Sequence, residues 1–345
     1  MFKKRSLAKA IGVVALLGAA GAQAVDPLTV SGNRVLSGGV AKSLAGNSLF
    51  WSNDLWGQEG FYSADTVAML KNDFNASIVR AAMGVDAEGG YLESPASNKG
   101  RVEAVVDAAI ANDIYVIIDW HSHVAENFPG DAVSFFQEMA TKYGNSDNVI
   151  YEIYNEPLQV SWNGTIKPYA ETVINAIRAI DPDNLIIVGT PSWSQGVVEA
   201  SQNPINGTNI AYALHFYAGT HHQWLRNDAA TAMNNGIALF VTEWGTVNAN
   251  GDGAVNHNET DLWMDFLLAN DISHLNWAVS NKVEGSSVFT PGGGLTESGT
   301  KVKQIVSTWP NQLTGSTSST SSSSSSSTSS TGGGGVSCTG VSVYP

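Results

Sequence analysis

The 345-residue chain has little cysteine, little positive charge and no long apolar run. Its single cysteine, Cys338, excludes a disulfide-stapled core and a zinc site built from cysteine ligands. Only 17 lysines and arginines oppose 31 aspartates and glutamates. This negative charge argues against nucleic acid and anionic membranes as partners, and it leaves a neutral polymer as a compatible one. No apolar stretch reaches the roughly 20 residues that a membrane-spanning helix needs.

The first 24 residues have the features of an export signal. The basic run Lys3-Lys4-Arg5 precedes an apolar segment over residues 11–20, and Ala22-Gln23-Ala24 is a small-residue cleavage site. We therefore expect a secreted, extracellular protein; the alternative is a buried N-terminal helix. Without the four basic residues of this segment, 13 basic side chains face 31 acidic ones, a net charge of −18.

The composition changes after Leu313. Residues 314–335 are almost entirely Ser, Thr and Gly, which bury no apolar surface, so we expect a flexible linker there. Residues 336–345 are too few for a domain, and we interpret them as the truncated start of a second module; the alternative is a disordered tail. Residues 338–345 resemble the start of a small cellulose-binding module, which implies that the second module is a carbohydrate-binding module. Cys338 lies in this last segment and has no partner in the sequence given.

Residues 25–313 have the length and pattern of one α/β domain, a (β/α)8 TIM barrel. Short apolar runs alternate with helix-period segments, which predicts a parallel sheet buried on both faces. An open doubly wound sheet is the alternative, but no Gly-x-Gly-x-x-Gly sequence follows the first strand. The predicted strands span residues 43–51, 77–83, 114–120, 148–154, 185–189, 210–217, 237–244 and 274–279, with helices predicted over 101–111, 132–142, 169–180 and 261–269.

Ionisable and aromatic residues gather where these strands end. Barrel enzymes place their chemistry at the C-terminal ends of the strands, so these side chains should share one mouth. Two are carboxylates, Glu156 after the fourth strand and Glu243 after the seventh. Glycoside hydrolysis needs such a pair, one protonated to help the leaving oxygen depart and one ionised. The rest of the set is Arg80, His121, Asn155, Trp193, His215, Tyr217 and Trp277.

Three motifs around these residues resemble glycoside hydrolase family 5, in particular the bacterial endoglucanases of its second subfamily, of the endoglucanase Z type. They are residues 149–157 (Val-Ile-Tyr-Glu-Ile-Tyr-Asn-Glu-Pro), 213–220 and 240–245, and the resemblance extends over residues 28–309. It implies a cellulase that cleaves β-1,4-glucan chains with net retention and needs no cofactor or metal. It also implies that Glu156 is the acid/base and Glu243 the nucleophile, supported by Arg80, His121, Asn155, His215 and Tyr217.

Physical reasons stand beside these implied roles. An adjacent cation lowers the pKa of a carboxyl group, so Arg80 should keep Glu243 ionised, and Tyr217 can donate to the same group. Asn155 suits the contact to the sugar 2-hydroxyl that strengthens in the transition state. The two histidines should bond other sugar hydroxyls. Once Glu243 carries the sugar, Glu156 should lose its proton and activate water.

Tryptophans supply flat apolar surfaces for sugar rings while keeping an N–H for a polar partner. Those at strand ends or in the following loops are candidate platforms, whereas Trp309 near the last helix is expected in the core. The candidate substrate-binding residues are Trp51, Trp56, Trp193, His221, Trp277, Lys282 and Glu284.

Rival functions remain open from the sequence. A β-mannanase or xyloglucanase would share the catalytic residues, because sugar choice lies in the loops. A non-catalytic carbohydrate-binding protein would be expected to have lost a glutamate or Arg80, and a surface adhesin would need an anchoring segment. We expect a monomer whose partner is cellulose, with no nucleic acid and no membrane.

Two weaker patterns suggest metals. His121-Ser122-His123 and His221-His222 lack the carboxylate pattern of a zinc site. Residues 248–253 with Glu259 nearly fit a calcium loop but lack its first aspartate. We favour a plain Gly/Asn-rich loop, with Asn258 or Glu259 starting the next helix.

The stereochemical expectation depends on which carboxylates reach the mouth. Asp119 precedes Trp120 and is expected to point away if His121 points in, which leaves no separate water-activating base. We therefore expect retention through a covalent intermediate on Glu243, with the two carboxyl groups about 5–5.5 Å apart.

Overall fold

The computed structural model describes residues 25–310. The predicted signal peptide, the Ser/Thr/Gly linker and the start of a second module lie outside these described residues. Within them, no helix combines the length and the hydropathy needed to cross a membrane.

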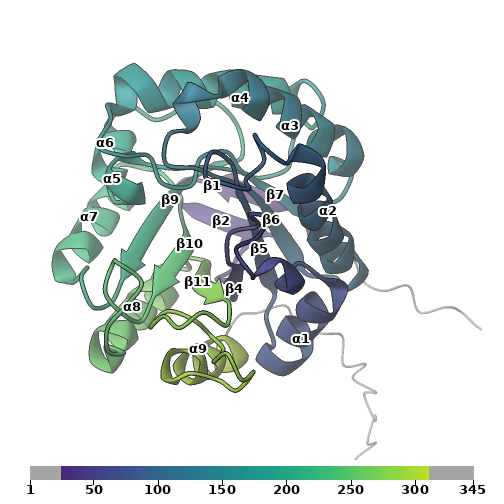
Figure 1. Ribbon diagram of the computed structural model, residues 1–345. Helices are drawn as coiled ribbons and strands as arrows, with labels where there is room; N and C mark the ends of the chain where they lie inside the picture. The colour runs from purple at the N-terminus through teal and green to yellow at the C-terminus, as the bar shows by residue number, and fades with distance from the viewer. Residues whose placement is uncertain (1–24, 311–345) are drawn as a thin grey trace, which may run out of the picture. The chain divides into compact units, whose positions relative to one another are not determined.

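Eight parallel strands close into a barrel, in the order β10-β11-β4-β5-β6-β7-β8-β9 (Figure 1). The prediction of a TIM barrel is confirmed, and each predicted strand overlaps an observed one. Their bounds are β4 Ala45–Leu49, β5 Ile78–Gly84, β6 Tyr115–His121, β7 Val149–Glu152, β8 Ile186–Val188, β9 Ile210–Tyr217, β10 Leu239–Gly245 and β11 His274–Val279.

The helices ring the strands in Figure 1 and cover their outer faces. Their bounds are α1 Ala64–Phe74, α2 Pro95–Ala111, α3 Pro129–Tyr143, α4 Lys167–Arg178, α5 Pro191–Ser194, α6 Val197–Gln202, α7 Gln223–Asn234, α8 His257–Ala269 and α9 Glu297–Thr308. Short 3-10 turns span Glu59–Phe61 and Ala125–Asn127, and a π-helical turn spans Trp162–Ile166.

Strand β6 shows why the strands read as apolar throughout. Val116 and Trp120 point outward into the core between sheet and helices. Tyr115 and Ile117 point inward and belong to the separate cluster that fills the barrel. Because successive residues of a strand face opposite sides, both faces of a parallel barrel strand need apolar residues. Charged residues inside such a strand are therefore exceptions, and in this chain they belong to the site.

Three N-terminal strands were not predicted. β1 (Leu28–Ser31), β2 (Arg34–Ser37) and β3 (Val40–Ala41) form a small antiparallel sheet. Leu28 and Val35 join the cluster inside the barrel, so the sheet closes the end opposite the strand C-termini. A hairpin signal was present in the sequence, because Gly32 (φ 58°) and the next residue form a two-residue turn between alternating apolar residues.

The loop after β10 and the start of α8 differ slightly from expectation. α8 begins at His257, one or two residues before the predicted start, because the Asn256 side chain accepts the Glu259 N–H at 3.1 Å. The Glu259 carboxylate is paired with the guanidinium of Arg226. That pairing occupies the residue that would complete the calcium pattern.

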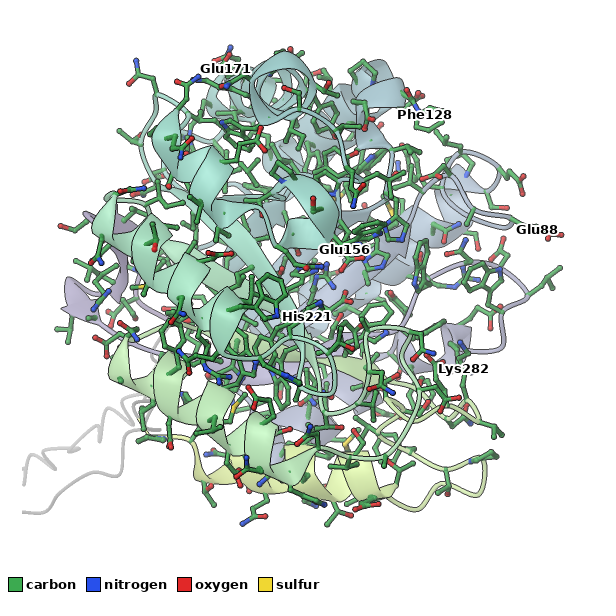
Figure 2. All side chains as sticks on the ribbon, turned by 90° about the vertical axis from the view of Figure 1, so that its left-hand side faces the viewer. Glu88, Phe128, Glu156, Glu171, His221 and Lys282 are labelled. Atoms are coloured by element: carbon green, nitrogen blue, oxygen red, sulfur yellow. The ribbon has the colours of Figure 1, made fainter. Side chains whose placement is uncertain are left out.

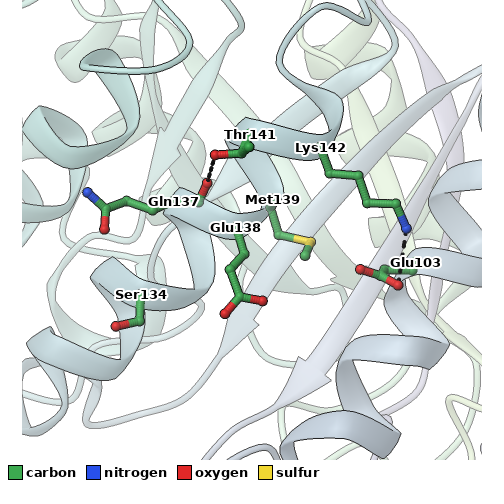
Figure 3. A pocket seen from close by; sticks show the side chains of 7 residues that line it. All are labelled: Glu103, Ser134, Gln137, Glu138, Met139, Thr141 and Lys142. Atoms are coloured by element: carbon green, nitrogen blue, oxygen red, sulfur yellow. Dashed lines mark hydrogen bonds and ion pairs between the residues drawn. The ribbon is translucent and has the colours of Figure 1, made fainter.

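A hollow of 530 Å³ lies between α2 and α3 on the outside of the barrel (Figure 3). Lys142 pairs with Glu103 across it at 3.1 Å. The hollow lies on the helical wall rather than at the strand ends, so it has no part in the site described next.

Candidate active site

The predicted catalytic carboxylates meet at the C-terminal ends of the strands. One carboxylate oxygen of Glu156, one of Glu243 and a ring nitrogen of His215 lie within 4.8 Å of one another. The side chain of Glu156 is 13% exposed and that of Glu243 is 6% exposed, so the first faces the mouth more openly. Figure 2 shows Glu156 close to His221, with Lys282 farther toward the edge of the molecule.

A β-bulge in β10 directs Glu243 into the mouth. The pairing of β10 with β9 shifts register between Phe240 and Glu243. Phe240 and Thr242 point into the barrel, while Trp244 packs in the outer core. A regular strand would turn Glu243 outward with the odd-numbered residues, but a bulge re-aims a side chain. Both Thr242 and Glu243 therefore reach the interior.

Arg80 lies below the mouth and connects its acidic groups. It was expected after the second strand but is the third residue of β5, fully buried inside the barrel. Its Nε donates to Glu152 at 2.7 Å, its Nη1 to Glu243 at 3.0 Å and its Nη2 to Asn155 at 2.6 Å. Burial opposes its charge, but the surrounding carboxylates raise the pKa of Arg80, so it remains a cation.

Asp119 points into the barrel, contrary to the expectation from the sequence. Its Oδ2 lies 3.0 Å from Arg80 Nη2 and 2.7 Å from His121 Nδ1. The expectation was wrong because residues 119 and 121 are two apart in one strand and must share a face. Burial, with the negative charges of Glu152 and Glu243, raises the pKa of Asp119 well above its ordinary value. Asp119 therefore holds Arg80 and His121 in place and lies below the carboxylates of Glu156 and Glu243.

The pKa of Glu243 depends on opposing effects and not, as expected from the sequence, on Arg80 alone. Burial and then the negative charge of Glu156 raise its pKa, while His215, Arg80 and a hydrogen bond from Tyr217 oppose that rise. The Tyr217 hydroxyl donates to Glu243 Oε1 at 2.7 Å, and Arg80 holds the other oxygen. The Coulombic penalty from Glu156 disappears when Glu156 is protonated, so one proton on the pair favours an ionised Glu243.

Two histidines have opposite charge preferences. Burial, followed by the charge of Arg80, lowers the pKa of His121 well below its ordinary value and keeps the ring neutral. For His215, burial lowers the pKa but hydrogen bonding involving Glu152 and Glu156 outweighs it and raises the pKa to about 9. His215 Nδ1 lies 2.9 Å from Glu156 Oε1. His215 is therefore a partner of Glu156, the predicted acid/base, rather than a free contact for sugar hydroxyls.

Three predicted platforms line the wall formed by β11 and β4. Trp277 stacks on His121 with centroids 5.0 Å apart and an interplanar angle of 5°. Trp51 lies edge-on to the His121 ring, with centroids 4.3 Å apart. The ring centroids of Trp51 and Trp56 are 5.5 Å apart. A hollow of 630 Å³ continues from Trp56 between the loops that follow β4 and β5. Trp277 is buried, so it can offer only a small face, whereas Trp56 is 39% exposed.

Trp193 lies on the other wall, after β8. Ser192, Trp193 and Ser194 have φ values of 58°, 56° and 56°, a left-handed conformation that such residues rarely adopt. The backbone N–H of Trp193 donates to Pro157 O at 2.8 Å, and Ser194 Oγ donates to Asn155 O at 2.8 Å. The strained turn is thus tied to the segment that carries Glu156, and strain of this kind gathers at functional sites.

His221 and the pair Lys282 and Glu284 complete the predicted set. Burial lowers the pKa of His221 to about 4, and its Nδ1 accepts the Tyr217 N–H at 2.8 Å. The ring is therefore neutral with its proton on Nε2, which has no acceptor among residues 25–310 and can donate to a substrate. Lys282 lies 2.7 Å from Glu284 and 4.1 Å from the centre of the Phe50 ring, at the rim of the β11 wall.

Trp309 is buried, as expected, and its indole N–H donates to Ser43 O at 3.1 Å.

Two residues of the site were missed. Glu152 bonds Arg80 from β7, and Thr242 donates to Glu152 Oε1 at 2.6 Å from β10. A signal for Glu152 existed, because a carboxylate inside an otherwise apolar strand needs a partner. Thr242 gave no signal, because a bulge is needed to place it beside Glu243 on the inner face.

The group Glu156, His215 and Glu243 is spaced closely enough to share a cation among the described residues. Each of its inner atoms already has a partner, however. His215 Nδ1 bonds Glu156, and Arg80 and Tyr217 hold both oxygens of Glu243. A cation would have to displace these bonds and lie next to the Arg80 guanidinium, so the donor set suits proton chemistry better.

Comparisons with known proteins agree with this geometry. The family model described as cellulase (glycosyl hydrolase family 5) matches residues 30–283. Endoglucanase Z of Dickeya dadantii (strain 3937) is 68% identical over 287 residues, which cover 83% of this chain and 67% of that protein. A solved structure from Cytophaga hutchinsonii has a TM-score of 0.80 and 50% identity, covering 82% of this chain and 94% of that one.

The catalytic domain of a Thermobifida fusca endoglucanase, solved as a variant in complex with cellotetraose, has a TM-score of 0.76 and 33% identity. That alignment covers 81% of this chain and 96% of the other. The chain spans between about half and two thirds of the length of the first curated relatives, at 67%, 55% and 52%.

Replacing Tyr217 with phenylalanine should raise the pKa of Glu243 further, because the Tyr217 hydroxyl is one of the groups that lower it. The acid limb of the kcat/KM profile should move to higher pH. The maximum should fall roughly 10- to 100-fold, as expected for losing one hydrogen bond to a charged group.

Tyr143→Phe is the matched control, since its hydroxyl donates to Asp107 at 2.9 Å on the outer helices. An acid limb that stays in place in Tyr217→Phe, or that moves equally in both variants, would contradict the role given to Tyr217.

Proposed function

The chain belongs to glycosyl hydrolase family 5 and its barrel is an endoglucanase domain, and we propose that Glu156 and Glu243 perform its double displacement. The observation that carries this proposal is the asymmetry of the pair. Both oxygens of Glu243 are held by donors, from Arg80 and Tyr217, which suits an ionised nucleophile. Glu156 has one oxygen bonded to His215 and is more exposed toward the mouth, which suits a group that passes a proton to substrate.

The spacing of the carboxylates supports retention. One oxygen of Glu156 and one of Glu243 lie within 4.8 Å of each other. This distance is close to the roughly 5–5.5 Å between the carboxyl groups of retaining sites and shorter than the roughly 6.5–9.5 Å of inverting sites. In the first step Glu243 attacks the anomeric carbon as Glu156 gives its proton to the leaving oxygen. In the second step the Glu156 carboxylate takes a proton from water, which displaces Glu243 from the sugar.

The supporting residues act on these two steps. Arg80 and Tyr217 hold Glu243 in place and favour its charge while it waits for substrate. Asn155, fixed by Arg80 at 2.6 Å, is placed to bond the sugar 2-hydroxyl. Neutral His121 donates from Nδ1 to Asp119, which leaves Nε2 to accept from a hydroxyl or from Asn155 at 3.5 Å.

We infer that the substrate is a β-1,4-glucan chain lying across the mouth between two aromatic walls. Trp51, Trp56 and Trp277 line one wall and Trp193 the other, with the carboxylate pair between them. The relatives named as endoglucanases favour glucan over mannan or xyloglucan, and one of them is 68% identical over 287 residues, a region that includes the loops in which sugar choice lies. The whole protein is proposed to be an exported monomer that binds cellulose, with no membrane or nucleic acid partner.

The test is a pair of isosteric substitutions. Glu156→Gln should lower kcat/KM on a soluble cellulose derivative roughly 10²- to 10⁴-fold, the usual contribution of a general acid. Glu243→Gln should lower it at least as much, because no glycosyl-enzyme can form. Folding is checked by circular dichroism, and mannan and xylan are assayed in parallel.

Glu171→Gln on α4 is the control, because that glutamate lies on the outer helical layer and should leave activity unchanged. Azide should partly rescue Glu156→Ala on a substrate with an activated leaving group and give a sugar azide of retained configuration. If a folded Glu156→Gln or Glu243→Gln protein kept half of the activity, that residue would not be catalytic. If the wild-type protein preferred mannan, the enzyme would be a mannanase rather than a glucanase.

A further inference from the structure

The ten tryptophans of the chain all lie within the described residues and divide by the partner of the indole N–H. Four buried ones donate to the protein, namely Trp162, Trp244, Trp263 and Trp309. Trp120 is fully buried with its N–H unpartnered. The indole N–H of the other five has no acceptor among residues 25–310. Trp277 lies within β11, and the remaining four follow the C-terminal end of a strand: Trp51, Trp56, Trp193 and Trp224. Four of the five are the platforms already described, and Trp224 shares their features.

Trp224 is the second residue of α7 and is 49% exposed. Its ring lies edge-on to His221, with centroids 5.9 Å apart at an interplanar angle of 74°. The support beneath it is rigid, because Trp263 donates to His221 O at 2.7 Å and the guanidinium of Arg226 lies over the Trp263 ring at 5.1 Å. A large apolar surface is thus held in place at the mouth and left open to solvent.

The side of the mouth on which Trp224 lies follows from the strand order. Trp277 lies in β11 and Trp51 follows β4, and these two strands are neighbours in the barrel. Glu156, Trp193 and Trp224 follow β7, β8 and β9, which are consecutive in the barrel. The acid/base must lie beside the leaving oxygen, so the wall that carries it faces the leaving part of the chain.

We propose that Trp224 is an outlying platform for a glucose unit of the leaving part of a β-1,4-glucan chain, beyond Trp193. The proposal rests on the proposed function. The apolar C–H face of a sugar packs on the exposed indole, while the free indole N–H and the Nε2–H of His221 offer donors to its hydroxyls. A short substrate that ends before this position gains nothing from Trp224.

The test compares a long and a short substrate. Trp224→Ala should lower kcat/KM on cellohexaose roughly tenfold, the scale of one lost apolar contact, and leave hydrolysis of 4-nitrophenyl cellobioside unchanged. Trp224→Phe should retain most of the activity on cellohexaose. Leu262→Ala on α8, which is 45% exposed, is the control for loss of a surface apolar residue.

An equal loss of kcat/KM on both substrates would assign Trp224 a structural role. No loss of kcat/KM on either substrate would show that Trp224 binds no glucose unit, and both outcomes overturn the proposal. A wild-type protein that cleaves neither substrate would instead overturn the proposed function. The two failures are therefore distinguishable.

A second inference concerns the hydrogen bonds behind Glu156. Thr242 Oγ1 lies 2.6 Å from Glu152 Oε1 and 2.7 Å from His215 Nε2. Burial raises the pKa of Glu152, but Arg80 and then His215 outweigh it and lower the pKa below its ordinary value, so Glu152 is an ionised acceptor. The single hydroxyl hydrogen of Thr242 is then donated to Glu152, and its oxygen must accept from His215 Nε2–H.

This direction of donation fixes the tautomer of His215. The proton on Nε2 is required in the neutral and the charged ring alike, so only Nδ1 gains or loses a proton. Nδ1 lies 2.9 Å from Glu156 Oε1, and a single proton can bridge those two atoms. The groups that face His215 electrostatically are Glu152, Glu156, Glu243, Asp119, His121 and His221.

We further infer that Thr242 and Glu152 are positioning residues that keep Nδ1 of His215 as the ring atom exchanging a proton with Glu156. The inference rests on the proposed role of Glu156. Without the Thr242 hydroxyl, the ring is free to place its proton on Nδ1 and its lone pair on Nε2. In that tautomer Nδ1 keeps its proton when the ring is neutral, so it can no longer exchange a proton with Glu156.

Thr242→Val removes the hydroxyl at nearly constant volume, and Thr242→Ser restores it. Nitrogen-15 NMR of the histidine rings should show Nε2 of His215 protonated at every pH in the wild type and in Thr242→Ser, and mixed tautomers in Thr242→Val. Thr242→Val removes the oxygen that accepts from His215 Nε2–H. Losing this bond should destabilise the charged ring, so the alkaline limb of the kcat/KM profile should move to lower pH in Thr242→Val. Its maximum should fall roughly tenfold.

A Thr242→Val protein with the wild-type tautomer and pH profile would overturn the inference. So would a folded Thr242→Ser protein that behaves like Thr242→Val, because it would assign the loss to packing rather than to the hydroxyl.

Discussion

The site depends on one buried cation, the guanidinium of Arg80, surrounded by acidic groups from three strands. It binds Glu152 from β7, Asp119 from β6 and Glu243 from β10 at 2.7 to 3.0 Å. Burying three carboxylates without it would be prohibitive, and removing one partner of such a network leaves an uncompensated charge. Because burying the charges of such a network costs about as much free energy as their attraction returns, the network is weak evidence for the stability of the fold. Its value lies in fixing where Glu243 and Asn155 stand relative to Glu156.

The contacts around that cation differ between the two carboxylates proposed as catalytic. Arg80 and Tyr217 bind Glu243, the proposed nucleophile, whereas His215 contacts Glu156, the proposed acid/base. The β10 bulge makes this possible, because it brings Thr242 and Glu243 to the same face of one strand. The barrel strands hold these residues, and the proposed sugar platforms lie in the strained turn at Trp193, in β11 and in the segments after β4 and β9.

Much of this could be predicted from the sequence, for physical reasons. The barrel strands are apolar on both faces and stand out at regular intervals, so all eight were found. Glu156 and Glu243 were chosen as the candidate catalytic pair because charged residues at the C-terminal ends of such strands have few other uses, and the structure brings their carboxylates together. Asp119 was assigned to the wrong face because strand alternation was misapplied, and Thr242 could not be found because bulges carry no sequence period. The small sheet β1–β3 was missed although its Gly32 turn was visible in the sequence. Trp224, proposed above as a sugar platform, was not selected from the sequence because a helix start was not treated as part of the mouth.

The central claim is that Glu243 forms a covalent intermediate which Glu156 then helps water to displace, and the anomeric form of the first product tests it most directly. Proton NMR of a fresh digest of a β-1,4-linked cello-oligosaccharide resolves the α and β anomers before mutarotation mixes them. Two displacements at one carbon predict that the β anomer accumulates first and the α anomer follows only by mutarotation. An α anomer that appears first would contradict the account.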